Sequence, residues 1–255
     1  MPVHTLRRLT GRRRTPWADR ALGLVLAAVA GAANAGGFVA VHQYTSHMTG
    51  IVSEMADHMA VGAWSMVAAG LGAVASFIVG AMVSTLLINW GRRQHLHSEY
   101  ALPLVLEAAV MLLFGLMGAG LSLRDWLFIP ATVSLLCFMM GLQNAMITKV
   151  SHAVIRTTHV TGIVTDIGIE LGRMVYWNRD ANPLLRPVHA DLGHLALLAG
   201  LLVLFFGGGV LGAMSFARIG YVTTLPLAAV LLLLAAVPMG DDLLRLRKRL
   251  LSTPG

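Results

Sequence analysis

Two polar segments carry the residue types that could do chemistry in this chain. Residues 45–54 read TSHMTGIVSE and residues 157–166 read TTHVTGIVTD, so six of the ten positions are identical. In each segment a histidine precedes Thr-Gly and then an apolar run. A threonine ahead of such a run is a good helix N-cap, and a helix N-terminus can hold an anion because its first backbone N–H groups are unpaired. Each segment is therefore predicted to open a new helix that could bind an anion.

The other residues of these segments suggest further roles. Glycine beside the threonine allows close backbone approach, and an acidic residue in the following turns could complement the helix dipole. A histidine that titrates near neutral pH could move protons. The alternative is that both segments only cap interfacial helices, with the histidines facing lipid headgroups. The candidate binding residues here are His47, Thr49, Gly50, Glu54, His159, Thr161, Gly162 and Asp166.

Four further candidates are polar residues expected inside apolar helices. Amides at membrane depth must find partners, so Asn34, Gln143 and Asn144 either join helices or line a polar pathway. Glu107 sits several residues into an apolar block, where an ionisable group is costly and is by default a functional hypothesis. Its counterpart in the second half is Val230. A place near the inner headgroups, reached by snorkelling, is the alternative for this glutamate.

The two segments belong to a longer internal repeat that keeps its order through both halves. The other matched groups are Gly31, Asn34 and Ala35 with Gly141, Asn144 and Ala145; Gly80-Ala81-Met82 with Gly212-Ala213-Met214; and Leu102-Pro103-Leu104 with Leu225-Pro226-Leu227. Each half contains three apolar blocks, and because three is odd, the second half must enter the membrane from the opposite side. Inverted repeats of this kind recur in transporters, with sites near the midplane. The residues expected to approach one shared polar cavity are Asn34, His47, Thr49, Asn144, His159 and Thr161.

Composition and block length predict an all-α membrane protein. Of the 255 residues, 56% are hydrophobic and 12% are charged, against about 45–50% and 25% in soluble domains. A run of about 20 apolar residues crosses a bilayer as a helix. Six such blocks lie near residues 20–42, 60–89, 101–123, 126–148, 192–216 and 219–239. The expected fold is six transmembrane helices arranged as a 3+3 inverted repeat.

The positive charges predict the orientation. Under the six-span reading, 17 of the 19 Lys and Arg residues fall on one side, and only Arg124 and Arg218 fall on the other. Because Lys and Arg stay cytoplasmic in short loops, both termini are expected in the cytoplasm of a bacterial inner-membrane protein. Residues 43–58 and 122–126 are then outside, and residues 91–100 and 149–191 are inside. The rival reading of the first block as a cleaved signal peptide would spoil this charge split.

The expected organisation is a basic tail (1–19), a first repeat (20–123), a second repeat (124–240) with a long inner loop (149–191), and a basic tail (241–255). The tails are expected to contact anionic lipid headgroups. Nucleic acid is not expected as a partner, because its binding would need the positive charges gathered on one surface with aromatic or base-reading partners, an arrangement that the tails do not show. Cys137 is the single cysteine, so no disulfide can form within one chain. No metal or cofactor motif is present.

The paired motifs also resemble a known family. GAANAGGF followed by SHMTG, and MGLQNA followed by RTTHVTG, are similar to the YoaK-like family of bacterial six-span membrane proteins, over roughly residues 20–240. The resemblance implies the topology and contributes no substrate. Asn34 stands where an Asp is common in that family, and Ile51 stands where an Asn commonly follows Thr-Gly. If that Asp carries a proton or cation in relatives, this chain lacks the group.

The expected function is transport of a small solute or ion, as a transporter or channel. Two alternatives stay open: a membrane scaffold or assembly factor without transport, and a lipid-modifying membrane enzyme. No enzyme signature is present in the sequence. The oligomeric state is also open, a homo-oligomer included.

Overall fold

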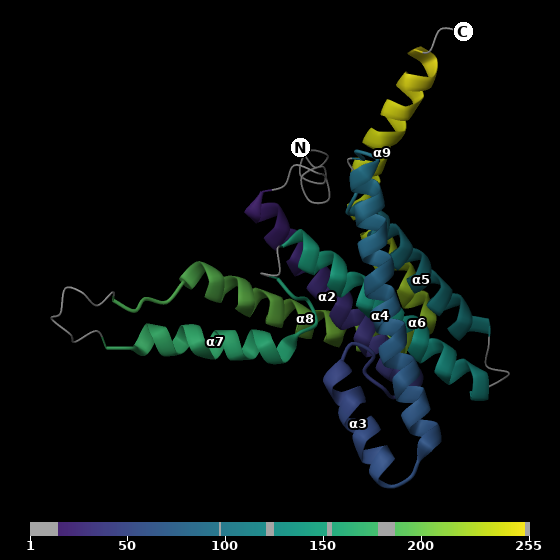
Figure 1. Cartoon of the computed structure of the whole chain (residues 1–255), viewed down its shortest axis with the longest axis vertical. Helices are drawn as coiled ribbons and strands as arrows, with labels where there is room; N and C mark the ends of the chain where they lie inside the picture. Colours follow the sequence, from purple (N-terminus) through teal and green to yellow (C-terminus); the bar gives the residue numbers. More distant parts are fainter. Residues whose placement is uncertain (1–14, 97, 121–124, 152–154, 178–186, 253–255) are drawn as a thin grey trace.

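The computed structural model describes residues 15–96, 98–120, 125–151, 155–177 and 187–252, and all regular structure in these ranges is helical (Figure 1). The helices in chain order are α2 (Pro16–Val41), α3 (Met48–Ala60), α4 (Trp64–Arg93), α5 (Ala101–Gly120), α6 (Asp125–Val150), α7 (Val160–Val175), α8 (Leu192–Ile219), the short 3₁₀ helix η1 (Gly220–Thr223) and α9 (Thr224–Ser252). α9 continues to Ser252, so the basic tail from residue 241 prolongs the last helix. The predicted outer loop at 122–126 lies mostly outside the described residues, as do parts of the N-terminal tail and of the long inner loop.

Local sequence signals set where the helices begin and end. Thr15 caps α2, its hydroxyl accepting a 3.3 Å hydrogen bond from Ala18 N, and Pro16 occupies the first helical position, where its missing N–H costs nothing. Asp191 caps α8 by accepting a 2.9 Å hydrogen bond from His194 N. α8 ends at Ile219, and its C-cap residue Gly220 has a φ of 61°, which suits glycine. That residue separates two apolar helices that would otherwise read as one.

Glycines bring two pairs of helices into backbone contact. A Cβ on Gly31 of α2 would overlap the carbonyl oxygen of Phe205 in α8, and one on Gly141 of α6 would overlap the carbonyl oxygen of Phe77 in α4. Small residues at such crossings let membrane helices pack closely. α2 with α8, and α4 with α6, are the closest-packed helix pairs of the described fold.

The reciprocal contacts at the same crossings correct the repeat alignment. A Cβ on Gly208 would overlap the carbonyl oxygen of Ala28, and one on Gly80 would overlap that of Phe138. Because Ala28 and Phe138 are equivalent in the matched α2 and α6, Gly208 is the structural counterpart of Gly80. The predicted match of Gly80-Ala81-Met82 with Gly212-Ala213-Met214 is therefore wrong by four residues, about one helical turn.

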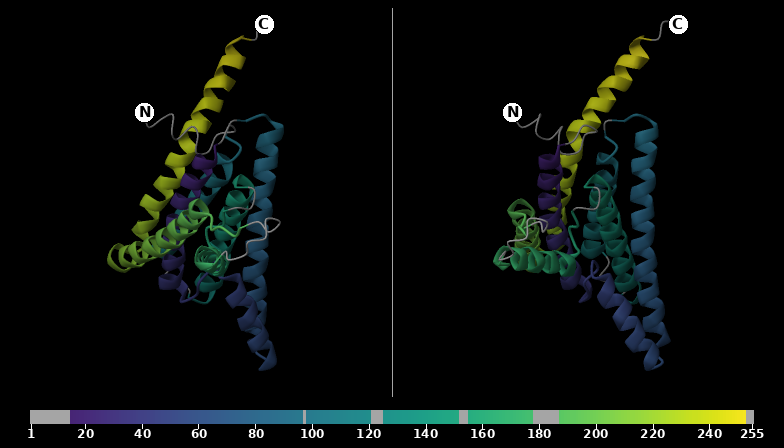
Figure 2. Two further views of the ribbon diagram at one scale, coloured as in Figure 1. Left: turned by 90° about the vertical axis from the view of Figure 1, so that its left-hand side faces the viewer. Right: turned by 60° about the vertical axis from the view of Figure 1, so that its left-hand side comes forward.

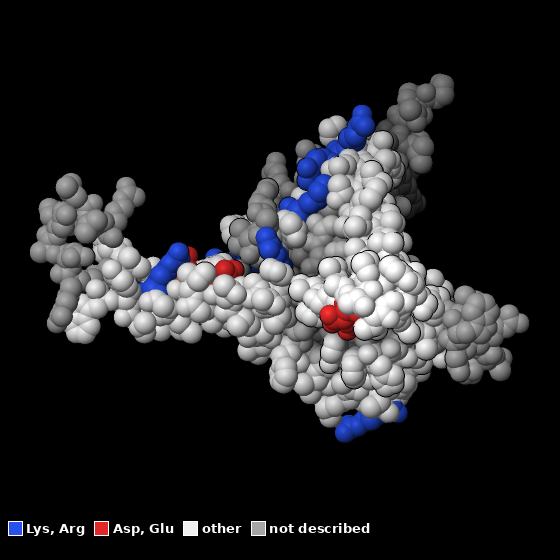
Figure 3. All heavy atoms as spheres, turned by 60° about the horizontal axis from the view of Figure 1, so that its bottom comes forward, with Lys and Arg blue, Asp and Glu red and all other residues white. Residues whose placement is uncertain are grey.

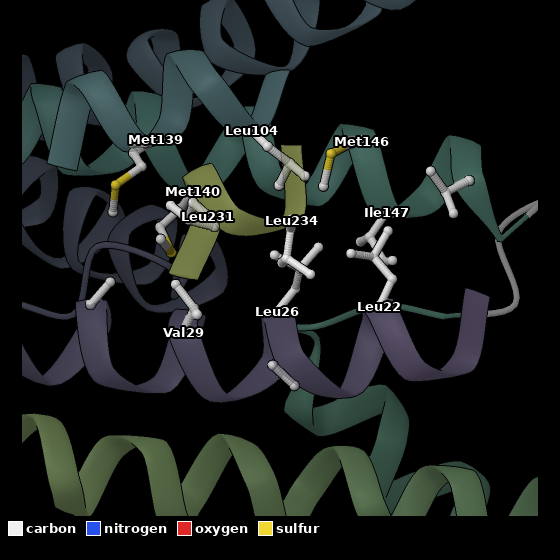
Figure 4. Close-up of a cluster of buried hydrophobic side chains, with 14 of the residues drawn as sticks. Leu22, Leu26, Val29, Leu104, Met139, Met140, Met146, Ile147, Leu231 and Leu234 are labelled. Atoms are coloured by element: carbon white, nitrogen blue, oxygen red, sulfur yellow. The ribbon is translucent and has the colours of Figure 1, made fainter. Parts of the chain in front are cut away.

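The core lies where α2, α5, α6 and α9 meet. Fully buried side chains from these four helices interdigitate there, as Figure 4 shows; they include Leu22, Leu26, Leu104, Met139, Met146, Ile147 and Leu231. Lipid tails are as apolar as leucine, so this burial stabilises the fold mainly through close packing and not through exclusion of water.

The outer surface is that of a membrane protein. Large apolar side chains face outward on several helices, among them Leu116 and Phe206, with 71% and 70% of their surface exposed. Most of the face seen in Figure 3 carries no Asp, Glu, Lys or Arg. Five helical segments of the described chain are long and apolar enough to cross a bilayer, and the last, Leu192–Leu244, runs through α8, η1 and most of α9. The chain is a multi-pass membrane protein.

Two helical hairpins project from the bundle. α3 packs against the first part of α4, and α7 packs against α8. The two hairpins point in different directions, as Figures 1 and 2 show. α7 lies within the predicted inner loop of residues 149–191 and ends at Val175, and Trp177 beyond it is 74% exposed.

Candidate functional site

A cavity of about 720 Å³ lies between the two halves of the chain. It is reached by α2, α3, α4, α6, α7 and α8 and by the two loops that precede the short helices. The residues that line it are Asn34, Tyr44, Ser46, His47, Met48, Thr49, Phe77, Asn144, Thr148, Arg156, Thr158, His159, Val160, Thr161 and Phe205. The six residues expected to approach one cavity are all among them.

The lining follows the internal repeat closely. Apart from Thr148, the lining residues fall into seven equivalent pairs. They are Asn34 with Asn144, Tyr44 with Arg156, Ser46 with Thr158, His47 with His159, Met48 with Val160, Thr49 with Thr161, and Phe77 with Phe205. Six of these pairs are chemically alike, whereas Tyr44 and Arg156 differ in charge. The cavity is therefore a pseudo-symmetric polar site with one asymmetric position.

Two amides hold the loops that lead into the short helices. Asn34 Oδ1 accepts hydrogen bonds from the backbone N of Ser46 at 3.3 Å and from its hydroxyl at 3.0 Å. Asn144 Oδ1 accepts a hydrogen bond from the Thr158 hydroxyl at 2.8 Å, and its Nδ2 donates to the carbonyl of Met140. Both amides thus line the cavity, and each holds the loop beside it by a hydrogen bond and does not join two helices.

A helix begins at each Thr-Gly segment, but the threonine is not its cap. The N-cap residues are His47 for α3 and His159 for α7, with closely similar backbone angles (φ −95° and ψ 69°; φ −85° and ψ 61°). Neither side chain makes a capping hydrogen bond. Thr49 and Thr161 are the second residues of their helices, already in helical backbone, so their predicted capping role is wrong.

The glycine of each segment makes room for the histidine. A Cβ on Gly50 would overlap the imidazole of His47, and a Cβ on Gly162 would overlap that of His159. Each ring therefore folds back over the first turn of its helix. This contact explains the shared His-x-Thr-Gly pattern, since any larger residue would push the ring away.

The acidic residues of the two segments lie away from the shared cavity. Glu54 and Asp166 are the seventh residues of α3 and α7, and neither helix has an acid in its first turn. The dipole's influence falls off within that first turn, so the predicted complement to the dipole is wrong. Asp166 lines a smaller adjoining hollow that also contains Arg156 and His159. Glu54 is exposed on α3.

Glu107 and Gln143 form a buried pair beside the site and not in it. Gln143 Nε2 donates a 2.8 Å hydrogen bond to Glu107 Oε1 and a longer one, 3.4 Å, to the carbonyl of Leu26. Glu107 is 0% exposed and its Oε2 has no hydrogen-bond partner in the described part of the chain. Full burial excludes the snorkelling alternative. The hydroxyl of Thr157 approaches Gln143 Oε1 at 3.5 Å, which connects the pair to the loop before α7.

Comparison with known proteins gives the family. The family described as "Protein of unknown function (DUF1275)" matches residues 22–237. The chain belongs to this family. The match agrees with the resemblance to YoaK-like proteins seen in the paired motifs. No curated protein and no solved structure matches the chain.

Sequence reasoning missed several lining residues of this DUF1275 chain, above all Arg156. It was counted only as one more positive residue of the inner loop. The repeat contained the signal, because YTSHMTG and RTTHVTG set Tyr44 against Arg156 at the start of the matched segment. Phe77 and Phe205 were also missed, although each begins a Phe-x-x-Gly pattern, with Gly80 and Gly208 three residues on.

Proposed function

We propose that this membrane protein is a transporter or channel for a small solute or ion, with its site in the cavity between the two repeats. The observation that carries the proposal is the lining itself. Equivalent residues from both halves meet at one polar cavity among apolar helices. Inverted-repeat transporters place their substrate sites at the repeat interface in the same way.

The backbone around the cavity supports this function. The loops before α3 and α7 are irregular, and irregular backbone is tolerated at membrane depth only where protein buries it or a cavity hydrates it. A scaffold would be expected to have dry packing between the two motifs, whereas both face an open volume of about 720 Å³. A lipid-modifying enzyme would be expected to gather carboxylates with the histidines in one cavity. Asp166 meets His159 only in the adjoining hollow, and the described lining of the main cavity contains no Asp or Glu.

The proposal includes six membrane crossings, by α2, α4, α5, α6, α8 and α9, with both termini in the cytoplasm. α3 and α7 have 13 and 16 residues, fewer than the roughly 20 that a crossing needs. The start of α2 and the end of α9 lie at the same end of the molecule (Figure 2). Single cysteines at Gly62 and Gln94, in a Cys137→Ala background, should label from the outside and from the inside respectively. Labelling of both from one side would contradict the proposed topology.

Flux through the purified protein in liposomes tests the function. Stopped-flow swelling would be recorded in potassium chloride, potassium butyrate and glycerol. Thr49→Val and Thr161→Val, which remove one lining hydroxyl each and keep side-chain shape, should slow the flux of the permeant probe to a similar extent. Ser53→Ala, on the exposed side of α3 and outside the lining, is the control and should not. Proteoliposomes no more permeable than empty ones to every probe would rule out transport of these solute classes and count against the function.

A further inference from the structure

We infer that the cavity binds a small organic anion, and that Arg156 is the group that attracts its charge. This inference rests on the proposed function for the identity of the site and adds the class of ligand. It follows from the charges, hydrogen-bond donors and apolar side chains that the lining brings together.

The charge balance of the cavity is positive. Arg156 is exposed, and the one side chain within hydrogen-bond distance of its guanidinium among the described residues is His159, whose Nδ1 lies 3.5 Å away. No Asp or Glu belongs to the described lining. The nearby carboxylate of Asp166 lies in the adjoining hollow and forms no ion pair with Arg156. An arginine left without a carboxylate at a cavity wall is a ready partner for an anion, which it can hold through paired N–H donors.

Hydrogen-bond donors supplement this charge. The hydroxyls of Thr49 and Thr161 line the cavity and make no hydrogen bond to other described residues. The first two residues of α3 and of α7 also line it, so two helix N-termini without side-chain caps open onto the same space. Each brings a partial positive charge of about half a unit. All these groups favour negative charge in the cavity.

The apolar side chains of the lining indicate that the ligand is organic. Phe77 and Phe205 lie on the wall from α4 and α8, and Met48 and Val160 add aliphatic surface from α3 and α7. Cavities of about 300–1,000 Å³ suit small organic ligands, and this one measures about 720 Å³. A single inorganic ion would leave most of that apolar wall uncovered. A carboxylate or phosphate ester with a short carbon body matches both parts of the lining.

The difference between Tyr44 and Arg156, the one asymmetric pair of the lining, indicates where the anionic group of the ligand binds. Arg156 occupies the position that Tyr44 holds in the first half, so one side of a near-symmetric cavity carries a permanent cation. The anionic group is therefore expected beside Arg156 and the N-terminus of α7, with the carbon body toward the two phenylalanines.

Binding in detergent tests the ligand class without requiring transport. The midpoint of thermal unfolding would be followed against rising concentrations of butyrate, butyramide and butylammonium, which share a carbon skeleton and differ in charge, at constant ionic strength. Only butyrate should stabilise the wild-type protein. Arg156→Gln should raise the apparent Kd for butyrate about tenfold or more, and Arg156→Lys should restore part of it. Arg218→Gln, which removes an exposed positive charge outside the lining, should bind as the wild type does.

A second variant and a lipid titration complete the test. Tyr44→Arg adds the missing cation and should tighten butyrate binding. Short-chain phosphatidylglycerol and phosphatidylcholine are compared in the same assay. If phosphatidylglycerol stabilises the protein, phosphatidylcholine and butyrate do not, and the effect is lost in Arg156→Gln, the cavity is an anion site whose ligand is a lipid headgroup.

The outcomes separate this inference from the proposed function. Stabilisation by butylammonium or butyramide, or butyrate binding unchanged in Arg156→Gln, would overturn the anion site even if the liposomes transport a solute. Arg156-dependent butyrate binding without any flux would uphold the anion site and count against transport.

Discussion

Thr158 donates a 2.8 Å hydrogen bond from its hydroxyl to Asn144, and Ser46 donates the equivalent bond to Asn34 at 3.0 Å. Each bond joins a membrane helix to the loop before a short helix, over 14 and 12 residues of chain respectively. The two short helices therefore start at places fixed by the same chemistry in both halves. The cavity depends on this, because it is the helix starts that line it.

The Asn144–Thr158 bond can be measured by a double-mutant cycle. Asn144→Ala, Thr158→Val and the double variant would be unfolded reversibly in mixed micelles. The expected coupling is about 0.6 kcal/mol, the average for side-chain hydrogen bonds inside membrane proteins. The same cycle on Asn34 and Ser46 should agree in sign. Additive single effects in both halves would show that these bonds do not hold the loops.

The glycine crossings provide a prediction with an adjacent control. Gly208→Ala should destabilise the fold by about 1–3 kcal/mol, because the added Cβ meets the backbone of Ala28, which cannot move aside easily. Gly207→Ala should be neutral or stabilising, since nothing lies within 4 Å of its Cβ position and alanine favours helix. Unfolding in the same micelles would compare the two.

The equivalent crossing in the first half extends this test. Gly80→Ala should cost about as much as Gly208→Ala, and Gly72→Ala, again with open space around it, should be tolerated. A large loss for Gly207→Ala, or none for Gly208→Ala, would contradict the register that places Gly208 opposite Gly80.

Much of this fold was predictable because it depends on short-range chemistry. Apolar block length predicted the membrane helices, and the matched polar segments predicted a helix start at each motif. The identity of the cap was not predictable in the same way. Thr49 has the better capping chemistry, but α3 starts at Met48 with His47 at the N-cap, and the His47 ring packs over Gly50. This contact between a histidine ring and the glycine three residues on depends on a pair of residues, and the capping preferences of single residues do not include it.

The alignment of the second and fifth blocks failed for a related reason. Gly-Ala-Met occurs in both blocks and gives the higher sequence identity, whereas alignment on Phe-x-x-Gly gives the correct structural register. Backbone contact selects the glycine that faces the neighbouring helix, and the sequence of one helix does not say which glycine that is. Arg156 was missed because a loop arginine is ordinarily a topology signal, and only the folded loop brings it to the cavity.

The buried Glu107–Gln143 pair predicts a contrast between two substitutions. Glu107→Gln keeps an oxygen that can accept the 2.8 Å bond from Gln143 and should cost little. Glu107→Leu removes that acceptor and leaves the Gln143 amide with only the longer contact to Leu26, which should cost about 1–3 kcal/mol. Adding Gln143→Leu should recover part of the loss, since both polar partners are then gone. Equal stability of the two single variants would mean that the bond contributes nothing.

The last prediction concerns Asp191, the residue that caps α8 and directly precedes the candidate membrane span that begins at Leu192. The backbone N–H of His194 donates to the Asp191 carboxylate, and this bond lowers the pKa of Asp191 below its usual value; the backbone of Gly193 and the charges of His194 and Arg20 act in the same direction. A folded-state pKa below the unfolded one adds stability above the unfolded value, near pH 4, and this stability is lost as the pH falls through the folded value. Asp191→Asn keeps a capping oxygen but no titrating charge. Between about pH 5 and pH 3 the wild type should therefore lose more thermal stability than Asp191→Asn does, while Asp191→Ala should be less stable than both at neutral pH. Parallel pH profiles for the wild type and Asp191→Asn would show that the charge of this cap does not contribute.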